Sequence, residues 1–253
     1  MNRSLRFLVA IGALAVAVLI SAALPCNAGS VKAGLRYWYP MWDRDQRYGF
    51  EDDPETDWGM VGPALDIELA DQWSLTGAFM FGQFDCEYEG GAKDTMDRYD
   101  FLMDINFRPF SEHVSPFMQS LKFVVSGQYI HWTETWETSA GETDYEYKKG
   151  IVGPGLGIAA AKSHGRFFWS LFGGYAYLFP VEDADDDTDY VHMVHGNAGV
   201  GYAVTPNLVL DLCYRVEWLD YSYKEFEIGG LKSADSANDV FHGPHLTVSY
   251  YIQ

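Results

Sequence analysis

The sequence predicts an all-β protein, an antiparallel up-and-down transmembrane barrel of about ten strands, with eight strands also possible. Three observations predict this fold: an apolar leader, ten segments in which apolar and polar residues alternate, and connections that alternate between short and long. A period of two places successive side chains on opposite faces of a strand. An even number of such strands, with tight turns at one end and long loops at the other, is typical of membrane barrels.

The first 28 residues have the layout of a secretory signal peptide. A basic head precedes an unbroken run of apolar and small residues at 7–24, and a small-residue cleavage motif ends at Ala28. We expect cleavage there, which leaves 29–253 as one barrel domain. The run is also long enough for a membrane helix. Cys26 raises lipidation as an alternative, although the proline before it fits that processing signal poorly.

Composition excludes several function classes. The formal net charge is −19 at pH 7, which argues against nucleic acid as a partner. Three cysteines are too few for a disulfide scaffold in an exported protein of this length. Aromatic residues make up 16% of the chain and glycine is abundant, which favours a β-rich fold.

The predicted strands are longer than those of most globular proteins, which have about 5–6 residues, and are adequate for a tilted membrane strand. The longer connections between them are acidic. The predicted strands cover residues 31–42, 58–70, 72–86, 97–109, 118–133, 147–162, 165–181, 189–204, 206–221 and 239–252, and the longer connections cover 43–57, 87–96, 134–146, 182–188 and 222–238.

The two faces of these strands differ in polarity. One face is continuously apolar, whereas the other mixes acids and bases, as expected for a paired network inside a barrel. A secreted β-sandwich or lipocalin-like barrel would point the apolar face inward, and alternation alone does not separate the two. The eight tryptophans lie mostly near strand ends, which predicts an aromatic girdle and favours the membrane. The predicted lumen network consists of Arg36, Asp66, Glu68, Asp104, Arg108, Asp211, Arg215 and Glu217.

A Gly-Pro pair recurs in three predicted strands, ending at Pro63, Pro154 and Pro244. Proline cannot donate to the strand ladder and is normally kept out of central strands. Every second residue of a strand lies on the same face, and this alternation, which we call parity, puts all three prolines on the apolar, outward face. We interpret the repeat as a device at the barrel rim, where a missing N–H can be spared.

Ten strands lie close to the limit at which side chains fill a barrel. We therefore expect a plugged polar lumen and a structural or surface-interaction role, adhesin-like, through acidic external loops. A narrow channel for ions or small solutes is an alternative. Residues 182–189 carry six acids in eight positions, so Asp185, Asp186 and Asp187 are weak candidates for a divalent cation. No other metal site and no cofactor is expected.

The architecture resembles the omptin family of ten-stranded outer-membrane proteases, and equally the ten-stranded adhesins. The local resemblance is strongest at "GYAVTPNLVLDL", a turn pattern common to many such barrels. For an omptin-like peptidase the resemblance implies Asp97 with Asp100 and Asp189 with His192 as candidates around an activated water. Both pairs depart from the family's tighter spacing, and a separation of three puts two strand residues on opposite faces. An enzyme is therefore the less favoured reading.

The expected location is the outer membrane. The last predicted strand, "HGPHLTVSYYIQ", resembles the terminal signal read by the outer-membrane assembly machinery, with Ile252-Gln253 in place of the usual terminal aromatic residue. The expected partners are the lipid bilayer with its outer-leaflet headgroups, the assembly machinery and an unknown extracellular partner.

Overall fold

The computed structural model describes residues 30–44, 55–87, 93–110, 116–138, 141, 143–183, 188–223, 227–228, 231–232 and 236–252. The predicted signal peptide and the acidic candidates Asp185, Asp186 and Asp187 lie outside these ranges. Cleavage after Ala28 and cation capture by this loop therefore stay predictions.

The described chain is built almost entirely of long β-strands. They are β1 (Ser30–Trp38), β2 (Met41–Arg44), β3 (Glu55–Ala70), β4 (Trp73–Glu87), β5 (Lys93–Phe107), β6 (Leu121–Glu137), β7 (Thr143–His164), β8 (Phe167–Asp183), β9 (Thr188–Ala203), β10 (Leu208–Tyr223) and β13 (Ser236–Ile252).

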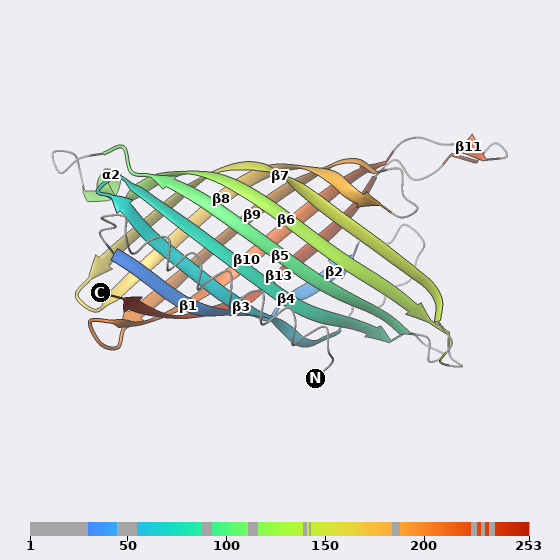
Figure 1. Ribbon diagram of the computed structural model, residues 1–253, viewed down its shortest axis with the longest axis horizontal. Coiled ribbons are helices and arrows are strands. Elements are labelled where there is room, and N and C mark those ends of the chain that lie inside the picture. Colours follow the sequence, from blue (N-terminus) through green and yellow to red (C-terminus); the bar gives the residue numbers. More distant parts are fainter. Residues whose placement is uncertain are drawn as a thin grey trace.

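These strands close into a barrel (Figure 1). Each strand pairs antiparallel with the next, in the order β1-β3-β4-β5-β6-β7-β8-β9-β10-β13, and β13 pairs back with β1. β2 pairs with β13 directly beyond β1, so β1 and β2 together occupy a single strand position in the barrel wall. We call each strand position of the wall a stave. The wall therefore has ten staves, and the predicted fold class is confirmed with ten strands instead of eight.

Several predicted loops are partly strand. β6 runs to Glu137 and β7 begins at Thr143, so their connection is much shorter than the predicted 134–146. The predicted loop 222–238 holds a small hairpin of β11 (Glu227–Ile228) and β12 (Leu231–Lys232). A short helix, α2 (Pro116–Ser120), replaces the start of the strand predicted at 118–133.

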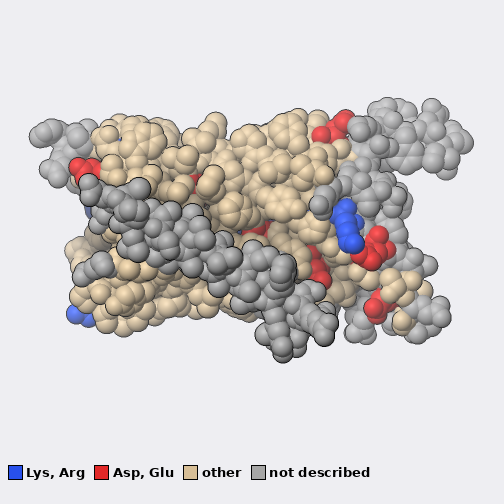
Figure 2. All heavy atoms as spheres, viewed as in Figure 1, with Lys and Arg blue, Asp and Glu red and all other residues tan. Residues whose placement is uncertain are grey.

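The outer wall of the barrel is apolar. Large apolar side chains on it are exposed, with Leu156 at 67% and Val200 at 61% of their full accessibility. The face in Figure 2 is largely free of charge, and most of its charged side chains lie toward the two ends. Water does not tolerate an apolar surface of this extent, whereas a bilayer does, and only a closed barrel lets strands cross it. The soluble-sandwich alternative is therefore wrong. Among the described residues, no helix is long and apolar enough to span a membrane.

The three Gly-Pro pairs lie well inside long strands, so the interpretation as a rim device is wrong. On one side each pair keeps its ladder partners, as at Arg36↔Gly62 and Gln128↔Gly153. On the other side the same two residues are skipped and pairing resumes without a register shift. Each pair therefore opens a local gap in the ladder toward one neighbour only.

The same local arrangement recurs at all three gaps. The register sets each proline opposite an aromatic residue, namely Phe79, Tyr177 or Tyr39. Because proline has no N–H to donate, the carbonyl of that aromatic residue leans over the preceding glycine. A Cβ on Gly62, Gly153 or Gly243 would collide with that carbonyl. The glycine, which has no Cβ, therefore leaves space for a carbonyl that has no proline N–H to accept from.

Candidate functional site

An ion cluster crosses the middle of the barrel. Arg98 on β5 and Glu217 on β10 point inward and meet, with 2.6 Å between Arg98 Nη2 and Glu217 Oε2. β5 and β10 stand five staves apart in a ring of ten, so they are on opposite sides of the wall. We call the cluster of Arg98, Asp100, Arg215 and Glu217 the crossbar.

Each charge in the crossbar has an opposite partner. Arg98 also holds Asp100 in a two-pronged contact, with Nε–Oδ1 at 2.8 Å and Nη2–Oδ2 at 3.0 Å. The second oxygen of Glu217 accepts a hydrogen bond from Arg215. Glu217 is fully buried and Arg98 nearly so. Planar guanidinium groups suit such forked contacts, and burial makes the contacts strong only when every charge is paired.

Further contacts extend the crossbar across the lumen. Gln128 on β6 and His195 on β9 are both buried, with 3.1 Å between Nε2 of each. Arg215 also reaches Met80 on β4, with Nη1–Sδ at 3.6 Å. The lumen is thus closed at this level by side chains from at least five strands.

An apolar cluster fills the lumen on the loop-bearing side of the crossbar, and we call it the plug. On β5, β6 and β10 its members lie nearer the long loops than the polar residues at the level of the crossbar do. Met96 precedes Arg98, Ile130 follows Gln128, and Leu219 follows Glu217. The buried Lys149 on β7 lies among the plug side chains, over the rings of Trp132 and Tyr221. The plug consists of Trp38, Trp42, Met60, Met80, Phe84, Met96, Ile130, Trp132, Ile151, Ala176, Leu178, Val191, Met193, Leu219, Tyr221 and Phe241.

The plug and the crossbar are in direct contact. The Arg98 guanidinium lies 4.4 Å from the centre of the Phe241 ring, and the Arg215 guanidinium lies 4.5 Å from that of Trp38. Cations over aromatic faces are attracted by the ring quadrupole, more so where water is excluded. Trp42 stacks on Phe241 with 5.6 Å between ring centroids and so continues the plug toward the loop-bearing end.

The short-turn side of the lumen is polar. Arg36 Nε, Asp104 Oδ1, Asp211 Oδ1 and His245 Nε2 are buried polar atoms on this side. This polar half of the lumen ends at the crossbar.

The predicted lumen residues lie in different surroundings, and not all of them interact. Arg215 and Glu217 form part of the crossbar. Asp66 pairs with Lys32, with 3.2 Å between Nζ and Oδ2. Glu68 accepts a hydrogen bond from Ser30 near the short-turn end. Arg36, Asp104 and Asp211 line the polar half of the lumen, and Arg108 is exposed at the short-turn end.

The peptidase candidates do not converge. Asp100 is buried against Arg98, whereas Asp97 is exposed, because neighbouring strand residues alternate across the wall. His192 lies on the outer wall, where Nδ1 contacts the Tyr175 hydroxyl. Asp189 is exposed near the loop-bearing end of β9, which is four staves away from β5.

No group of three or more metal-ligating side chains occurs among the residues that the structure describes. Cys213 and His245 form a smaller pair in the polar half of the lumen, with 3.2 Å between Sγ and Nδ1. Cys213 is free and buried.

Sequence reasoning missed Arg98 and the plug. Arg98 lies two residues before Asp100 and therefore on the same face of the strand, and this spacing was the signal that could have placed Arg98 in the lumen. The tryptophans were expected in a girdle, yet Trp38, Trp42 and Trp132 are buried in the lumen. Trp169 and Trp218 do face outward, as a girdle requires. The expected polar plug is thus a polar crossbar under an apolar plug.

Neither a comparison with protein-family models nor one with curated proteins gives a match. Among solved structures, the chain is similar to the outer-membrane protease OmpT from Escherichia coli, with a TM-score of 0.49 and 12% identity over 88% of this chain and 97% of that chain. It is also similar to the translocator domain of the autotransporter NalP from Neisseria meningitidis, with a TM-score of 0.43 and 11% identity over 94% of this chain and 96% of that chain. The toluene transporter TodX from Pseudomonas putida follows with a TM-score of 0.23 and 10% identity over 88% of each chain. These similarities carry no argument about activity, and the fold rests on the register described above.

Proposed function

We propose that the protein is a closed, non-conducting barrel of the outer membrane that presents its loop-bearing end for surface interaction. One observation carries this proposal: the lumen is blocked twice, by the crossbar and by the plug. A solute that entered from the short-turn side would meet buried ion pairs between opposite strands, and then the packed side chains of the plug.

The loop-bearing end is the part of the molecule left free to act. Binding sites commonly lie on loops held by a rigid scaffold, and the plug makes this end of the scaffold rigid. The loop sequence at 182–189 is strongly acidic. An acidic loop on an anionic membrane favours basic partners, which it would attract through its field.

Conductance in a planar lipid bilayer tests the closed lumen. The refolded protein is expected to show no stable open level. Weakening both barriers with Glu217→Ala and Trp38→Ala in one chain should introduce brief conducting events, because the centre then lacks the ion pair between opposite strands and one of the largest plug side chains. Outward-facing Trp169→Ala and Trp218→Ala serve as a matched control and should stay silent. A stable open level in the unchanged protein would contradict the proposal.

A second experiment tests the surface role. The six acids in 182–189 are replaced by their amides, and proteoliposomes are applied to a surface coated with polylysine. Binding should fall at least fivefold at moderate salt, while the gel shift between heated and unheated samples stays unchanged. Glu68→Gln with Asp71→Asn, two exposed acids at the short-turn end, is the control. Unchanged binding by the loop variant would remove this loop from the interaction surface.

A further inference from the structure

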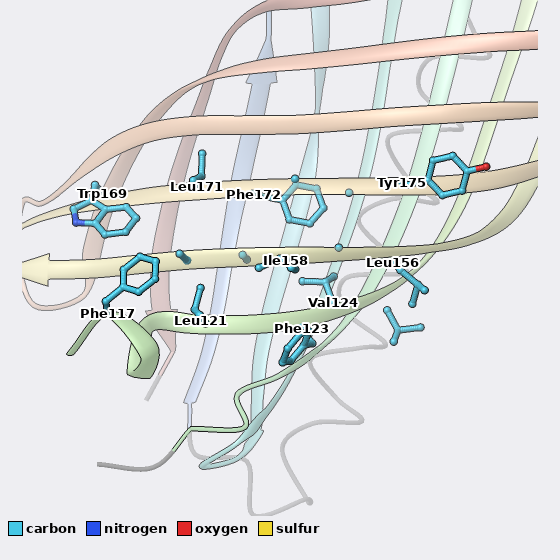
Figure 3. A pocket seen from close by; sticks show the side chains of 16 residues that line it. Phe117, Leu121, Phe123, Val124, Leu156, Ile158, Trp169, Leu171, Phe172 and Tyr175 are labelled. Atoms are coloured by element: carbon cyan, nitrogen blue, oxygen red, sulfur yellow. The ribbon is translucent and has the colours of Figure 1, made fainter. Parts of the chain in front are cut away.

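The outer wall carries an apolar groove of about 760 Å³ beside α2 (Figure 3). It runs over β6, β7 and β8, and Phe117 of α2 lies at its short-turn end. Phe117 is 58% exposed and Leu156, in the groove wall, is 67% exposed. The groove therefore opens toward the surroundings of the barrel and does not belong to the lumen.

A missing side chain creates the groove. The register places Phe123, Ile158 and Gly173 in one row on adjacent strands. Gly173 in turn lies opposite Gly196 of β9, so the large side chains stop at β7. A Cβ at Gly173 would meet no atom within 4 Å. The space is therefore open and is not filled by a neighbour.

Basic residues stand at one end of the groove. Lys162, His164 and Arg166 belong to the β7–β8 hairpin and are all exposed. Lys162 lies directly opposite Trp169, which is part of the groove wall. Trp169 faces outward, where an interfacial tryptophan sits at headgroup level.

This part of an otherwise acidic chain carries no acids. The segments 116–133, 150–181 and 190–210, which supply α2 and most of β6 to β9, contain no Asp or Glu. The whole chain has a formal charge of −19. The positive charge at the groove is therefore a local exception that nearby carboxylates on these segments do not cancel.

The length of the groove suits one leaflet. Leu156 and Lys162 are six residues apart on β7, which is about 20 Å along a strand. With a tilt of about 40° this is about 15 Å of depth, or half of a hydrocarbon core of about 30 Å.

We propose that this groove binds one anionic phospholipid from the leaflet at the short-turn end. An acyl chain lies along Ile158 and Gly173, and the phosphate group contacts Lys162 and Arg166. Apolar lining with cations at one end matches a lipid tail under an anionic headgroup. A second copy of the chain is less suited, because a symmetric contact through this face would bring two basic clusters together.

Native mass spectrometry of the detergent-solubilised full barrel tests the proposal, with phosphatidylglycerol and phosphatidylcholine as probes. One phosphatidylglycerol should be retained in preference to phosphatidylcholine. Lys162→Gln with Arg166→Gln should weaken its binding about fivefold for each charge removed. Gly173→Leu should weaken the binding of both lipids, because the new side chain occupies the groove.

Two matched variants serve as controls. Gly77→Leu also adds a side chain where a Cβ meets nothing within 4 Å, but Gly77 lies outside the groove. Arg108→Gln removes an exposed cation from the same end of the barrel. Both should bind phosphatidylglycerol within twofold of the unchanged protein. Equal retention of the two lipids, no retained lipid, or equal losses in test and control variants would overturn the proposal. So would a dimer that Gly173→Leu dissociates without changing lipid binding.

Discussion

Removing the charge of Glu217 should destabilise the barrel more than any other single change from a carboxylate to an amide among the ion pairs described here. Glu217 is fully buried between Arg98 and Arg215. In Glu217→Gln the two guanidinium groups stay in place and share Asp100 as the remaining carboxylate. One buried positive charge then has no counter-charge at the centre of the lumen.

The contacts of Glu217 set the size of the effect. Each hydrogen bond to a charged group contributes about 1.5–3 kcal/mol, and breaking a buried ion pair by removing one partner costs about 3–5 kcal/mol. Glutamine keeps one acceptor oxygen, so we expect a loss of about 3 kcal/mol in the free energy of unfolding. With a denaturant slope of about 1–3 kcal/mol/M, the urea midpoint should fall by at least about 1 M.

Urea titration of the barrel in detergent micelles, followed by the heat-dependent gel shift, measures this loss. The matched control is Glu146→Gln. Glu146 pairs with Lys148 at 2.7 Å, but their side chains are 52% and 55% exposed. Exposed pairs contribute about 0–1 kcal/mol, so the control midpoint should hardly move.

A further variant separates charge from packing. Adding Arg215→Gln to Glu217→Gln removes the uncompensated cation and leaves Arg98 paired with Asp100. The double variant should recover part of the lost stability. If Glu217→Gln and Glu146→Gln shift the midpoint equally, or if the double variant loses the sum of both single changes, the crossbar is not a paired network.

Three other predictions follow from the wall and the plug. Gly153→Ala should lower the free energy of unfolding by about 1–3 kcal/mol, because its Cβ collides with a neighbouring carbonyl; Gly127→Ala, with nothing within 4 Å, should be near neutral in the same urea titration. Trp38→Ala should cost about 3–5 kcal/mol as a buried cavity, whereas outward Trp169→Ala should cost less in micelles. In a background without other cysteines, Cys213 should react with maleimide only after unfolding, because it is buried and bonded to His245; fast labelling of the folded barrel would show that the lumen is open at this level.

Much of the fold could be predicted from local alternation. Parity alone placed Asp104, Arg215 and Glu217 inside and Leu210 or Val248 outside, because side chains alternate wherever a strand is unbroken. Parity does not give the position of a side chain along the barrel axis, however. It could not place Arg98 opposite Glu217, since that contact depends on the register of staves that are 119 residues apart in sequence.

The plug was hidden for a related reason. Its members, such as Met60 and Met96, stand on the same face as the charged residues and look like breaks in the alternation. Only when all strands are aligned do these breaks fall at one level. A barrel of this width can close over either kind of side chain, and this chain uses ions at mid-height and apolar packing nearer the loops.

The Gly-Pro repeat needs both the sequence pattern and the strand register to be explained. Sequence established correctly that Pro154 and Pro244 face outward, and both are exposed there. It could not show that each proline lies opposite an aromatic residue whose carbonyl leans over the glycine, because that residue belongs to another strand. The glycine faces the lumen, where a side chain would crowd the wall. The proline faces the membrane, where an N–H without a partner would be costly. Proline is therefore the residue that can leave a ladder position empty in a bilayer without exposing a donor, and the repeat is a feature of the wall and not of the rim.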